Sequence, residues 1–330
     1  MNIRLNANPD DEPYKALPIS VGHGVHVNGI RMRYITIKII LDNGAYKESH
    51  DQESNVMTLT CNSFYGHCNA SISIVKAGLG FSGESANITI HGFDKNTIEQ
   101  LLYMQEISPE DLGINAVEVY AGNYKSDENG LPNFIYRGEV FSATLPSIPI
   151  SNDIGLVINS LSGGNSLNEY TQTTSVDGNT SVERVIRNII SKAEYGYIPN
   201  INIPAISVTD IHLDGNWRIQ LADICKKFRL KFRIDADIIR VAPYANILAV
   251  SKKTTISSNN VMQGSPEGGN RSVIVNAWYD SDLIYGQKIT LLSQFDYFNG
   301  DYIIIGMKIN IANNDDAWDN QLTLMRYYGK

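Results

Sequence analysis

The sequence is poor in charge, in cysteine and in long hydrophobic runs, and each shortage excludes a class of protein. Charged residues make up 19% and hydrophobic residues 43% of the 330 residues, whereas disordered chains combine high charge with low hydrophobicity. The longest apolar runs, residues 35–41 and 302–307, are far shorter than the roughly 20 residues of a membrane-spanning helix. We therefore expect a globular protein without a membrane span. At roughly 150 residues per domain, the length predicts two domains, or one large domain with an insertion.

Cysteine and runs of basic residues are also scarce. The three cysteines, Cys61, Cys68 and Cys225, are an odd number for a secreted fold held by disulfides, so we expect all of them to be reduced thiols. The N-terminus has no basic segment followed by an apolar stretch, which predicts synthesis in a cytosol and retention there. The net charge is -8 and no run of Lys or Arg exceeds a pair, so tight nucleic-acid binding is disfavoured.

Alternation of apolar and polar residues dominates the first 147 residues. The clearest case, residues 31–41, is rich in β-branched side chains and ends at Asp42-Asn43-Gly44, which predicts a strand followed by a turn. The same pattern recurs at residues 56–61, 70–75, 86–92, 116–120 and 133–144. Short strands at regular spacing are typical of a β-barrel or sandwich, so we expect residues 1–147 to form a first β-barrel.

Two segments interrupt these strands. Residues 97–104 place Ile98, Leu101 and Leu102 on one stripe, which predicts a short helix that covers one side or end of the barrel. Residues 122–132 are polar at their tip and predict a projecting hairpin.

The middle of the chain has the pattern of a small α+β module at residues 179–250. Residues 162–179 are rich in Gly, Ser, Asn and Thr and predict a linker in front of it. The sequence Thr180-Ser181-Val182-Glu183 matches a capping box, and apolar residues then recur at steps of three and four, which predicts a helix. Residues 231–241 predict a β-hairpin that turns at Asp235-Ala236-Asp237.

A second helix is predicted between these two elements. Its apolar face holds Trp217, Leu221, Ile224, Cys225 and Phe228, and its polar face holds Arg218, Gln220, Asp223 and Lys227.

A second β-barrel is predicted at the C-terminus. Its strands are expected at residues 273–279, 287–292, 301–310 and 318–327. The apolar run 154–161 would most economically supply its first strand, so that the α+β module is an insertion. We therefore expect three units: residues 1–147, residues 148–178 with 251–330, and the inserted residues 179–250.

Motifs that would carry chemistry are weak. Gly78-Leu79-Gly80-Phe81-Ser82-Gly83 has the spacing of a dinucleotide-binding loop, but that loop must open a helix and a strand pattern follows here, so a Gly-rich bend is the better interpretation. We also expect no metal site, because no spacing matches paired zinc ligands. The residues considered for it are His23, His26, His67, His91, Cys61 and Cys68.

Candidates for catalysis have plainer explanations. Cys225 lies on the apolar face of a predicted helix, where a thiol is usually an inert packing residue. The acidic pairs lie in loops or turns, where Asp forms local hydrogen bonds; they are Asp10-Asp11, Asp235 with Asp237, and Asp315-Asp316. We expect no catalytic, cofactor-binding or metal-binding residue.

Tyrosine is abundant, with 18 residues, and two interpretations stay open. The clusters Tyr195/Tyr197, Tyr297/Phe298 and Tyr327/Tyr328 could form a surface that binds sugar or a partner, because interface cores favour aromatic side chains. Equally, aromatic side chains fill strands and cores.

Short motifs follow one another in a fixed order in the C-terminal half. They are Gly-x-Pro within residues 257–266, a strand at 273–279, the step 283–289, the strand start Gly300-Asp301-Tyr302, and Asp316-Ala317-Trp318. This order resembles the baseplate hub protein of contractile-tailed bacteriophages, a family built from tube-like β-barrels. The helix with Trp217 and Leu221 and the hairpin that leads to Tyr244 resemble the module that precedes these motifs in that family.

The resemblance implies a fold and a function. The fold is mainly β, with two tail-tube-like β-barrels and a small α+β insertion. The protein would be a structural, non-enzymatic virion component, made in the host bacterial cytoplasm and assembled as a homotrimer. Its pseudo-sixfold ring would join a tail tube or distal tube protein to a central spike protein, with a tape measure protein as a further partner, and would let DNA pass without specific binding. The alternatives from other classes are a tail-associated carbohydrate-binding module that uses the tyrosines and a cell-wall hydrolase.

Overall fold

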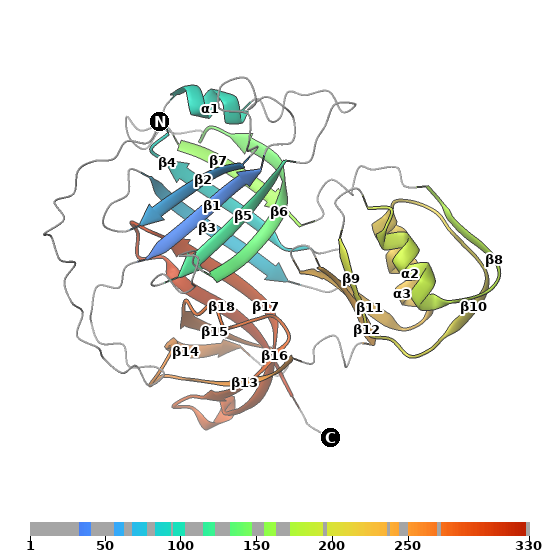
Figure 1. The fold of residues 1–330 in the computed structure, drawn as a ribbon. Coiled ribbons are helices and arrows are strands. Elements are labelled where there is room, and N and C mark those ends of the chain that lie inside the picture. Colours follow the sequence, from blue (N-terminus) through green and yellow to red (C-terminus); the bar gives the residue numbers. More distant parts are fainter. Residues whose placement is uncertain are drawn as a thin grey trace, which may run out of the picture.

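A computed structural model gives the arrangement of the chain (Figure 1). It describes residues 33–40, 56–62, 68–77, 83–93, 95–102, 115–122, 133–146, 155–162, 172–193, 197–235, 238–243, 250–268 and 272–327. The described residues are mainly in strands, as the alternation of the sequence predicts. None of their helices has the length and hydropathy required to cross a bilayer.

In the part of the N-terminal β region that the structure describes, there are seven strands and a helix. The strands are β1 (Tyr34–Ile40), β2 (Val56–Asn62), β3 (Asn69–Ala77), β4 (Ser85–His91), β5 (Ala116–Gly122), β6 (Asn133–Thr144) and β7 (Gly155–Leu161). Helix α1 (Lys95–Leu102) lies at one end of these strands (Figure 1) and buries Ile98 and Leu101, which confirms the predicted helix and its apolar stripe.

The C-terminal β region contains β13 (Val250–Ser257), β14 (Met262–Gly268), β15 (Val273–Trp278), β16 (Gln287–Leu292), β17 (Gly300–Ala312) and β18 (Trp318–Arg326). A short 3-10 helix, η3 (Asp296–Phe298), precedes β17. The Gly-x-Pro sequence lies inside β14, where the pairing with β15 shifts register between Gln263 and Glu267. Proline fits there because β14 ends the sheet and the shift removes the demand for a regular ladder.

Strands of both β regions form one continuous sheet. The described strands pair in the order β14-β15-β18-β17-β3-β4-β7-β6-β5-β1-β2, and β16 joins β17 to β13. The link between the two regions is β17. Its first half pairs with β16 and its second half, from Gly306 to Ala312, pairs with β3. One strand is therefore shared by the two regions, and the change of partner coincides with a register shift against β18 between Ile304 and Gly306.

The position of β7 differs from the prediction. The run 154–161 was expected to open the C-terminal barrel, but β7 pairs with β4 on one edge and with β6 on the other. Its alternating burial suits this place, because Leu156 and Ile158 enter the same core as Ile88 and Ile90 of β4. Hydrophobic alternation marks a strand but does not determine which neighbour it pairs with.

The inserted module has a hydrophobic core of its own. Its elements are β8 (Thr174–Ser181), α2 (Val182–Ile190), β9 (Ile198–Ile201), β10 (Ser207–Leu213), α3 (Trp217–Lys227), β11 (Leu230–Asp235) and β12 (Ile238–Pro243). The two helices pack on each other, β8 pairs with β10, and β12 lies between β11 and β9. The core lies between the helices and both small sheets, and the module stands to one side of the two β regions (Figure 1).

Both predicted helices of the module are confirmed, with one change at the first. The N-cap of α2 is Ser181, whose hydroxyl accepts a hydrogen bond from the Arg184 amide, rather than Thr180. Glu183 instead forms an ion pair with Arg187 (2.8 Å) one turn later. Five residues of α2 are buried, and they recur at the predicted spacing: Val182, Val185, Ile186, Ile189 and Ile190.

Two predictions for the module are wrong. Part of the predicted linker, residues 174–179, belongs to strand β8. Its residues are almost all polar, so no apolar period announces it, and its ladder with β10 supplies the order. On α3, Arg218 and Gln220 were assigned to a polar face in water, but both are fully buried. The periodicity of a helix sequence shows which residues share a face, but it does not show whether another part of the protein packs on the polar face.

Candidate functional site

The inserted module meets both β regions at one junction, which contains a cleft of about 380 Å³. The cleft is lined from three directions. The N-terminal β region contributes Lys76 of β3, Glu84 just before β4, and Phe134 and Ile135 of β6. The module contributes Arg233, Ile238 and Arg240. The C-terminal region contributes residues 279–281 and 283–285 with Met307 and Ile309. Lys76 and Glu84 form an ion pair (3.2 Å) in its wall. The position of the cleft makes this junction the candidate functional site.

A buried charged cluster fixes the module at this junction. Arg218 of α3 and Glu139 of β6 are both buried. Burial lowers the pKa of Arg218, while the nearby Tyr197 and Glu139 favour its charged form. An arginine stays protonated even so, and a buried charge persists only where an opposite charge compensates it. Glu139 supplies that compensation from the neighbouring unit.

Two aromatic side chains of the module complete the cluster. The Tyr197 hydroxyl donates a hydrogen bond to Oε1 of Glu139 (3.2 Å). The Tyr197 ring packs on Trp217 with 5.4 Å between ring centroids, and the guanidinium carbon of Arg218 lies 6.0 Å from the Trp217 ring. The module therefore contacts β6 through the hydrogen bond from Tyr197 to Glu139, beside the Trp217 ring and the buried Arg218 guanidinium.

A second contact holds the module against the C-terminal region. Nη1 of Arg233 donates a hydrogen bond to the Tyr285 carbonyl oxygen (3.0 Å), and the guanidinium lies over the Tyr285 ring (5.0 Å). Ala242 of β12 packs with Tyr285 and Ile303 in a small separate core. Two contacts at different places fix an orientation as well as a position, so the module and both β regions are held together.

Polar side chains also lie beneath the junction. The Tyr136 hydroxyl donates a hydrogen bond to Oγ of Ser160 (3.0 Å), and burial raises the Tyr136 pKa, so the phenol stays neutral. The Ser162 hydroxyl donates to the Arg137 carbonyl oxygen (2.6 Å). Sequence reasoning missed this cluster and Glu139. Their one signal is a polar residue inside an otherwise apolar strand, which is too common to single them out.

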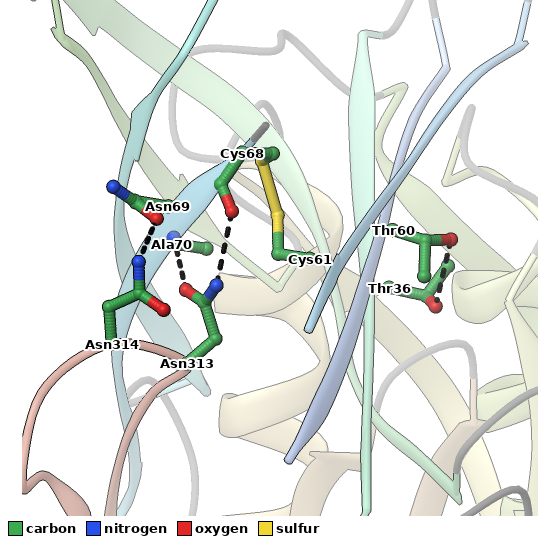
Figure 2. Close-up of a disulfide and its surroundings, with 8 residues drawn as sticks. All are labelled: Thr36, Thr60, Cys61, Cys68, Asn69, Ala70, Asn313 and Asn314. Atoms are coloured by element: carbon green, nitrogen blue, oxygen red, sulfur yellow. Dashed lines mark hydrogen bonds between the residues drawn. A yellow bond between two sulfur atoms is a disulfide. The ribbon is translucent and has the colours of Figure 1, made fainter. Parts of the chain in front are cut away.

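The cysteine prediction is wrong for two of the three residues. Cys61 and Cys68 form a disulfide, with their Cα atoms 5.2 Å apart (Figure 2). The prediction used only the odd number of cysteines and the expected compartment. The two residues meet because β2 ends and β3 begins close together, which neither of those observations reveals. Cys225 is free and buried, as predicted, and burial raises its pKa to about 12. A thiol in that state is a packing residue.

The turn after β17 clamps the chain beside this disulfide. Nδ2 of Asn313 donates to the Cys68 carbonyl oxygen (3.0 Å), and its Oδ1 accepts from the Ala70 amide (2.7 Å) (Figure 2). Asn314 and Asn69 are hydrogen-bonded beside it. Arg33 donates to the Asp315 carbonyl oxygen and lies over the Trp318 ring (5.3 Å). The clamp joins segments more than 240 positions apart, which no local pattern could predict.

Those other sequence candidates that fall within the described residues do not come together in one site. The Gly-rich sequence 78–83 lies outside the described residues up to Ser82, and the strand β4 that follows it confirms that it does not open a helix. His23, His26 and His67 also lie outside them, while His91 ends β4. Within the described part of the chain, no group of three or more His, Cys, Asp or Glu side chains could hold a metal ion.

The acidic and aromatic candidates are likewise scattered. Asp315 and Asp316 are exposed in the turn after β17, while Asp10, Asp11 and Asp237 lie outside the described residues and the side chain of Asp235 is not described. Tyr197 is buried in the module, whereas Tyr297 and Tyr327 are exposed in the C-terminal region. Tyr195 and Tyr328 and the tip of the predicted hairpin, residues 123–132, lie outside the described chain. Among the residues described, the tyrosines of these clusters are therefore divided between the buried core of the module and the surface of the C-terminal region.

Comparison with known families decides what this arrangement is. A family model described as baseplate hub gp41 matches residues 58–323. The chain belongs to the baseplate hub gp41 family. The resemblance of the sequence motifs to a phage baseplate hub is thereby confirmed, and the protein is a structural component of a phage tail baseplate. No curated protein matches the sequence of this hub protein.

Three solved structures, of two tail proteins and one type VI secretion component, share this fold. The hub protein is similar to a tail protein from Neisseria meningitidis MC58 (TM-score 0.58, 9% identity, covering 88% of this chain and 96% of that one). It is similar to a 43 kDa tail protein of prophage MuSo2 from Shewanella oneidensis (TM-score 0.57, 10% identity, covering 89% of this chain and 97% of that one). It also resembles the E. coli c3393 protein (TM-score 0.54, 13% identity, covering 79% of this chain and 74% of that one). That protein is described as a type VI secretion component with structural similarity to the T4 tail proteins gp27 and gp5. At these identities the likeness shows the fold.

Proposed function

We propose that the protein forms a homotrimeric ring in which each subunit contributes two tube-like β-barrels, built from its N-terminal and its C-terminal β region. Three subunits then present six similar units to a sixfold tail tube or distal tube protein and keep threefold symmetry toward a central spike protein. The ring is a symmetry adapter with a lumen through which DNA passes, and a tape measure protein is a further partner. The division into residues 1–147, 148–178 with 251–330, and 179–250 stays a prediction, although β7 itself pairs with β4 and β6 of the N-terminal β region.

The shared strand β17 is the observation that carries this proposal. Because Gly300–Ala312 pairs with β16 in one region and β3 in the other, the two β regions lie side by side in one hydrogen-bonded sheet. A wall made of six units from three chains requires each chain to hold its two units in a fixed relation. Hydrogen bonds along one continuous strand provide that relation more rigidly than a flexible linker does.

Exposed apolar side chains support contacts between subunits. On β6 and just after it, Phe134, Phe141 and Leu145 are exposed by 46%, 60% and 49%. Around η3, the side chains of Phe295 and Tyr297 are exposed by 50% and 57%. Interface cores are rich in aromatic residues and poor in charge, so these exposed side chains are candidates for contacts between subunits.

The charge of the chain suits a conduit. With a net charge of -8, the wall would repel phosphate rather than hold it, so DNA slides without specific binding. The hub is proposed to be non-enzymatic and to need no cofactor, its role being mechanical. It is made in the host bacterial cytoplasm before it enters the virion. The alternative function, a tail-associated protein that binds carbohydrate or hydrolyses the cell wall, has no gathered set of side chains to favour it among the residues described.

The oligomeric state in solution and in the virion tests the proposal. Light scattering on the purified chain should give the mass of a trimer, and images of virions should place three copies around the tail axis. Phe141→Asp should weaken the trimer, whereas Ile219→Asp, which changes an exposed apolar residue on the inserted module (41% exposed), serves as a matched control. A single copy or six copies around the axis, or a monomer that binds glycans through Tyr297, would contradict it.

A further inference from the structure

Cys61 and Cys68 connect the last strand of the sheet to a central one. Cys61 lies in β2, and Cys68 directly precedes β3 (Figure 2). β2 pairs with β1 along its whole length, and none of the described strands pairs with its other edge. Both edges of β3 are occupied, one by β4 and the other by β17. The disulfide is therefore a covalent link between two strands that share no ladder of hydrogen bonds.

The two ends of this link are held differently. Cys68 is fixed by Asn313, which bonds both to the Cys68 carbonyl oxygen (3.0 Å) and to the Ala70 amide (2.7 Å). Asn313 is itself buried in the turn after β17. On the other side, Cys61 depends on the ladder between β2 and β1, to which the Thr36 and Thr60 hydroxyls (3.5 Å apart) add a weak cross-strand contact (Figure 2). When the disulfide opens, β2 loses its covalent link to β3 and keeps only its ladder with β1, while Asn313 still holds the start of β3.

The two cysteine residues also differ in exposure. Cys61 is fully buried, whereas Cys68 is partly exposed. Thiol–disulfide exchange needs a thiolate that the external disulfide can reach, so Cys68 meets a reagent from solution first. Cys61, placed beside it, is then the resolving thiol. Cys225 takes no part, because it is buried in the separate core of the module.

We propose that the Cys61–Cys68 pair is a redox-dependent cross-link that stabilises the edge strand β2. In an environment as reducing as a cytosol the pair is a dithiol, and in an oxidising one it closes by exchange with a low-molecular-weight disulfide of the glutathione type. This inference goes beyond the proposed hub function and does not depend on it, because it rests on the two cysteines, Asn313 and the pairing of the strands.

Closure takes two exchange steps. The Cys68 thiolate attacks one sulfur of glutathione disulfide, so that a mixed disulfide forms and one glutathione thiolate leaves. The Cys61 thiolate attacks the Cys68 sulfur, so that the protein disulfide forms and the second glutathione leaves. Two protein thiols are oxidised and one glutathione disulfide is reduced. The two cysteine protons end on the two glutathione thiolates.

The redox state thereby sets how firmly an open sheet edge is held. A strand with one unpaired edge is a template for pairing with another chain. With the bond closed, β2 is tied to the clamped start of β3, and with the bond open it keeps only its ladder with β1. The cross-link is therefore expected to reduce local opening of β2 when the protein leaves a reducing environment.

Thiol counting over a series of glutathione buffers tests the chemistry. The full chain is equilibrated from reducing to oxidising ratios, unfolded in an alkylating reagent and weighed by intact mass. We expect three alkylated thiols at the reducing end and one, Cys225, at the oxidising end. Cys225→Ser, the matched control, should show the same transition with one thiol fewer throughout. Three reactive thiols in every buffer, or a bond that survives the reducing end, would overturn the proposal.

Single variants test the order of attack. In the oxidising buffer, Cys61→Ser should accumulate a glutathione adduct on Cys68, because no resolving thiol remains. Cys68→Ser should accumulate little adduct on the buried Cys61. The reverse pattern would overturn the assignment of the two roles.

Hydrogen exchange on the wild-type chain tests the mechanical consequence, and it requires no variant to fold. Reduction should raise the exchange rates of the β2 amides, residues 56–62, by about tenfold or more and leave those of residues 69–77 unchanged. In Asn313→Asp, which loses the donor to the Cys68 carbonyl, exchange at residues 69–77 should rise as well. Equal exchange of β2 in both redox states would overturn the proposal.

Discussion

Tyr197 of the inserted module donates a hydrogen bond to the carboxylate of Glu139 on β6 (3.2 Å), and both side chains are buried. The same carboxylate favours the charged form of Arg218, which no solvent reaches. Glu139 of the N-terminal β region therefore compensates the charge of Arg218, which belongs to a module with its own hydrophobic core. The orientation of the module depends on this contact and on the hydrogen bond from Arg233 to Tyr285.

Removing the charge of Arg218 should be costly. Arg218→Met leaves the Glu139 carboxylate buried without its cation, and breaking a buried pair typically costs about 3–5 kcal/mol. Urea unfolding followed by tryptophan fluorescence measures the loss, because Trp217 lies in the same cluster. Arg218→Met combined with Glu139→Gln should recover most of the stability. Arg184→Met, at an exposed position on α2, should change it by no more than about 0.5 kcal/mol. Equal losses in the single and double variants would show that the two charges are not coupled.

Gly83 is required for a close approach of backbone and side chain. A Cβ atom there would lie 2.6 Å from the Ser162 carbonyl oxygen and 3.2 Å from Nη2 of Arg218. We expect Gly83→Ala to destabilise the chain by about 1–3 kcal/mol through this overlap. Gly264→Ala meets nothing within 4 Å and carries only the strain of φ +68°, about 1 kcal/mol. Thermal unfolding of both variants compares them, and a smaller loss at Gly83 would contradict the packing described.

Gln220 and Asp223 should behave differently although sequence periodicity gives them one face of α3. Gln220 is buried, accepts a hydrogen bond from the Thr174 hydroxyl (2.6 Å) and donates one to the Gly215 carbonyl oxygen (2.7 Å). Gln220→Ala leaves buried partners unsatisfied and should cost about 1–3 kcal/mol. Asp223→Ala, at an exposed position, should cost less than about 0.5 kcal/mol. Denaturant midpoints with unchanged slopes check this, and equal midpoints for the two variants would contradict it.

Stability should fall in alkali, in part because of Cys225. Burial raises the pKa of its thiol from 9.0 to about 12, so above pH 9 the unfolded chain loses a proton that the folded chain still holds. The unfolded state then binds fewer protons, and the free energy of unfolding declines between the two pKa values. Urea unfolding at pH 8 and pH 10 measures this slope, which should be shallower in Cys225→Ala. An unchanged slope in that variant would show that the thiol titrates normally.

The sequence by itself determined the class of the fold and the identity of its elements. Alternation marked strands such as residues 133–144, and the capping pattern with its apolar spacing marked the helix after Ser181, because these signals reside in one element and its burial. The order of short motifs around Trp278, Gly300 and Trp318 was enough to indicate the baseplate hub family.

Only the tertiary structure decided which elements meet. β7 pairs with β4 and β6 rather than opening the C-terminal region, β8 gains its order from β10, and Arg218 finds its counter-charge on β6. The disulfide between Cys61 and Cys68 and the clamp by Asn313 likewise depend on where strands end. Pairing, counter-charges and cross-links are relations between surfaces far apart in the chain. Each becomes favourable only after loop closure has brought its partners together, so no local pattern of residues contains it.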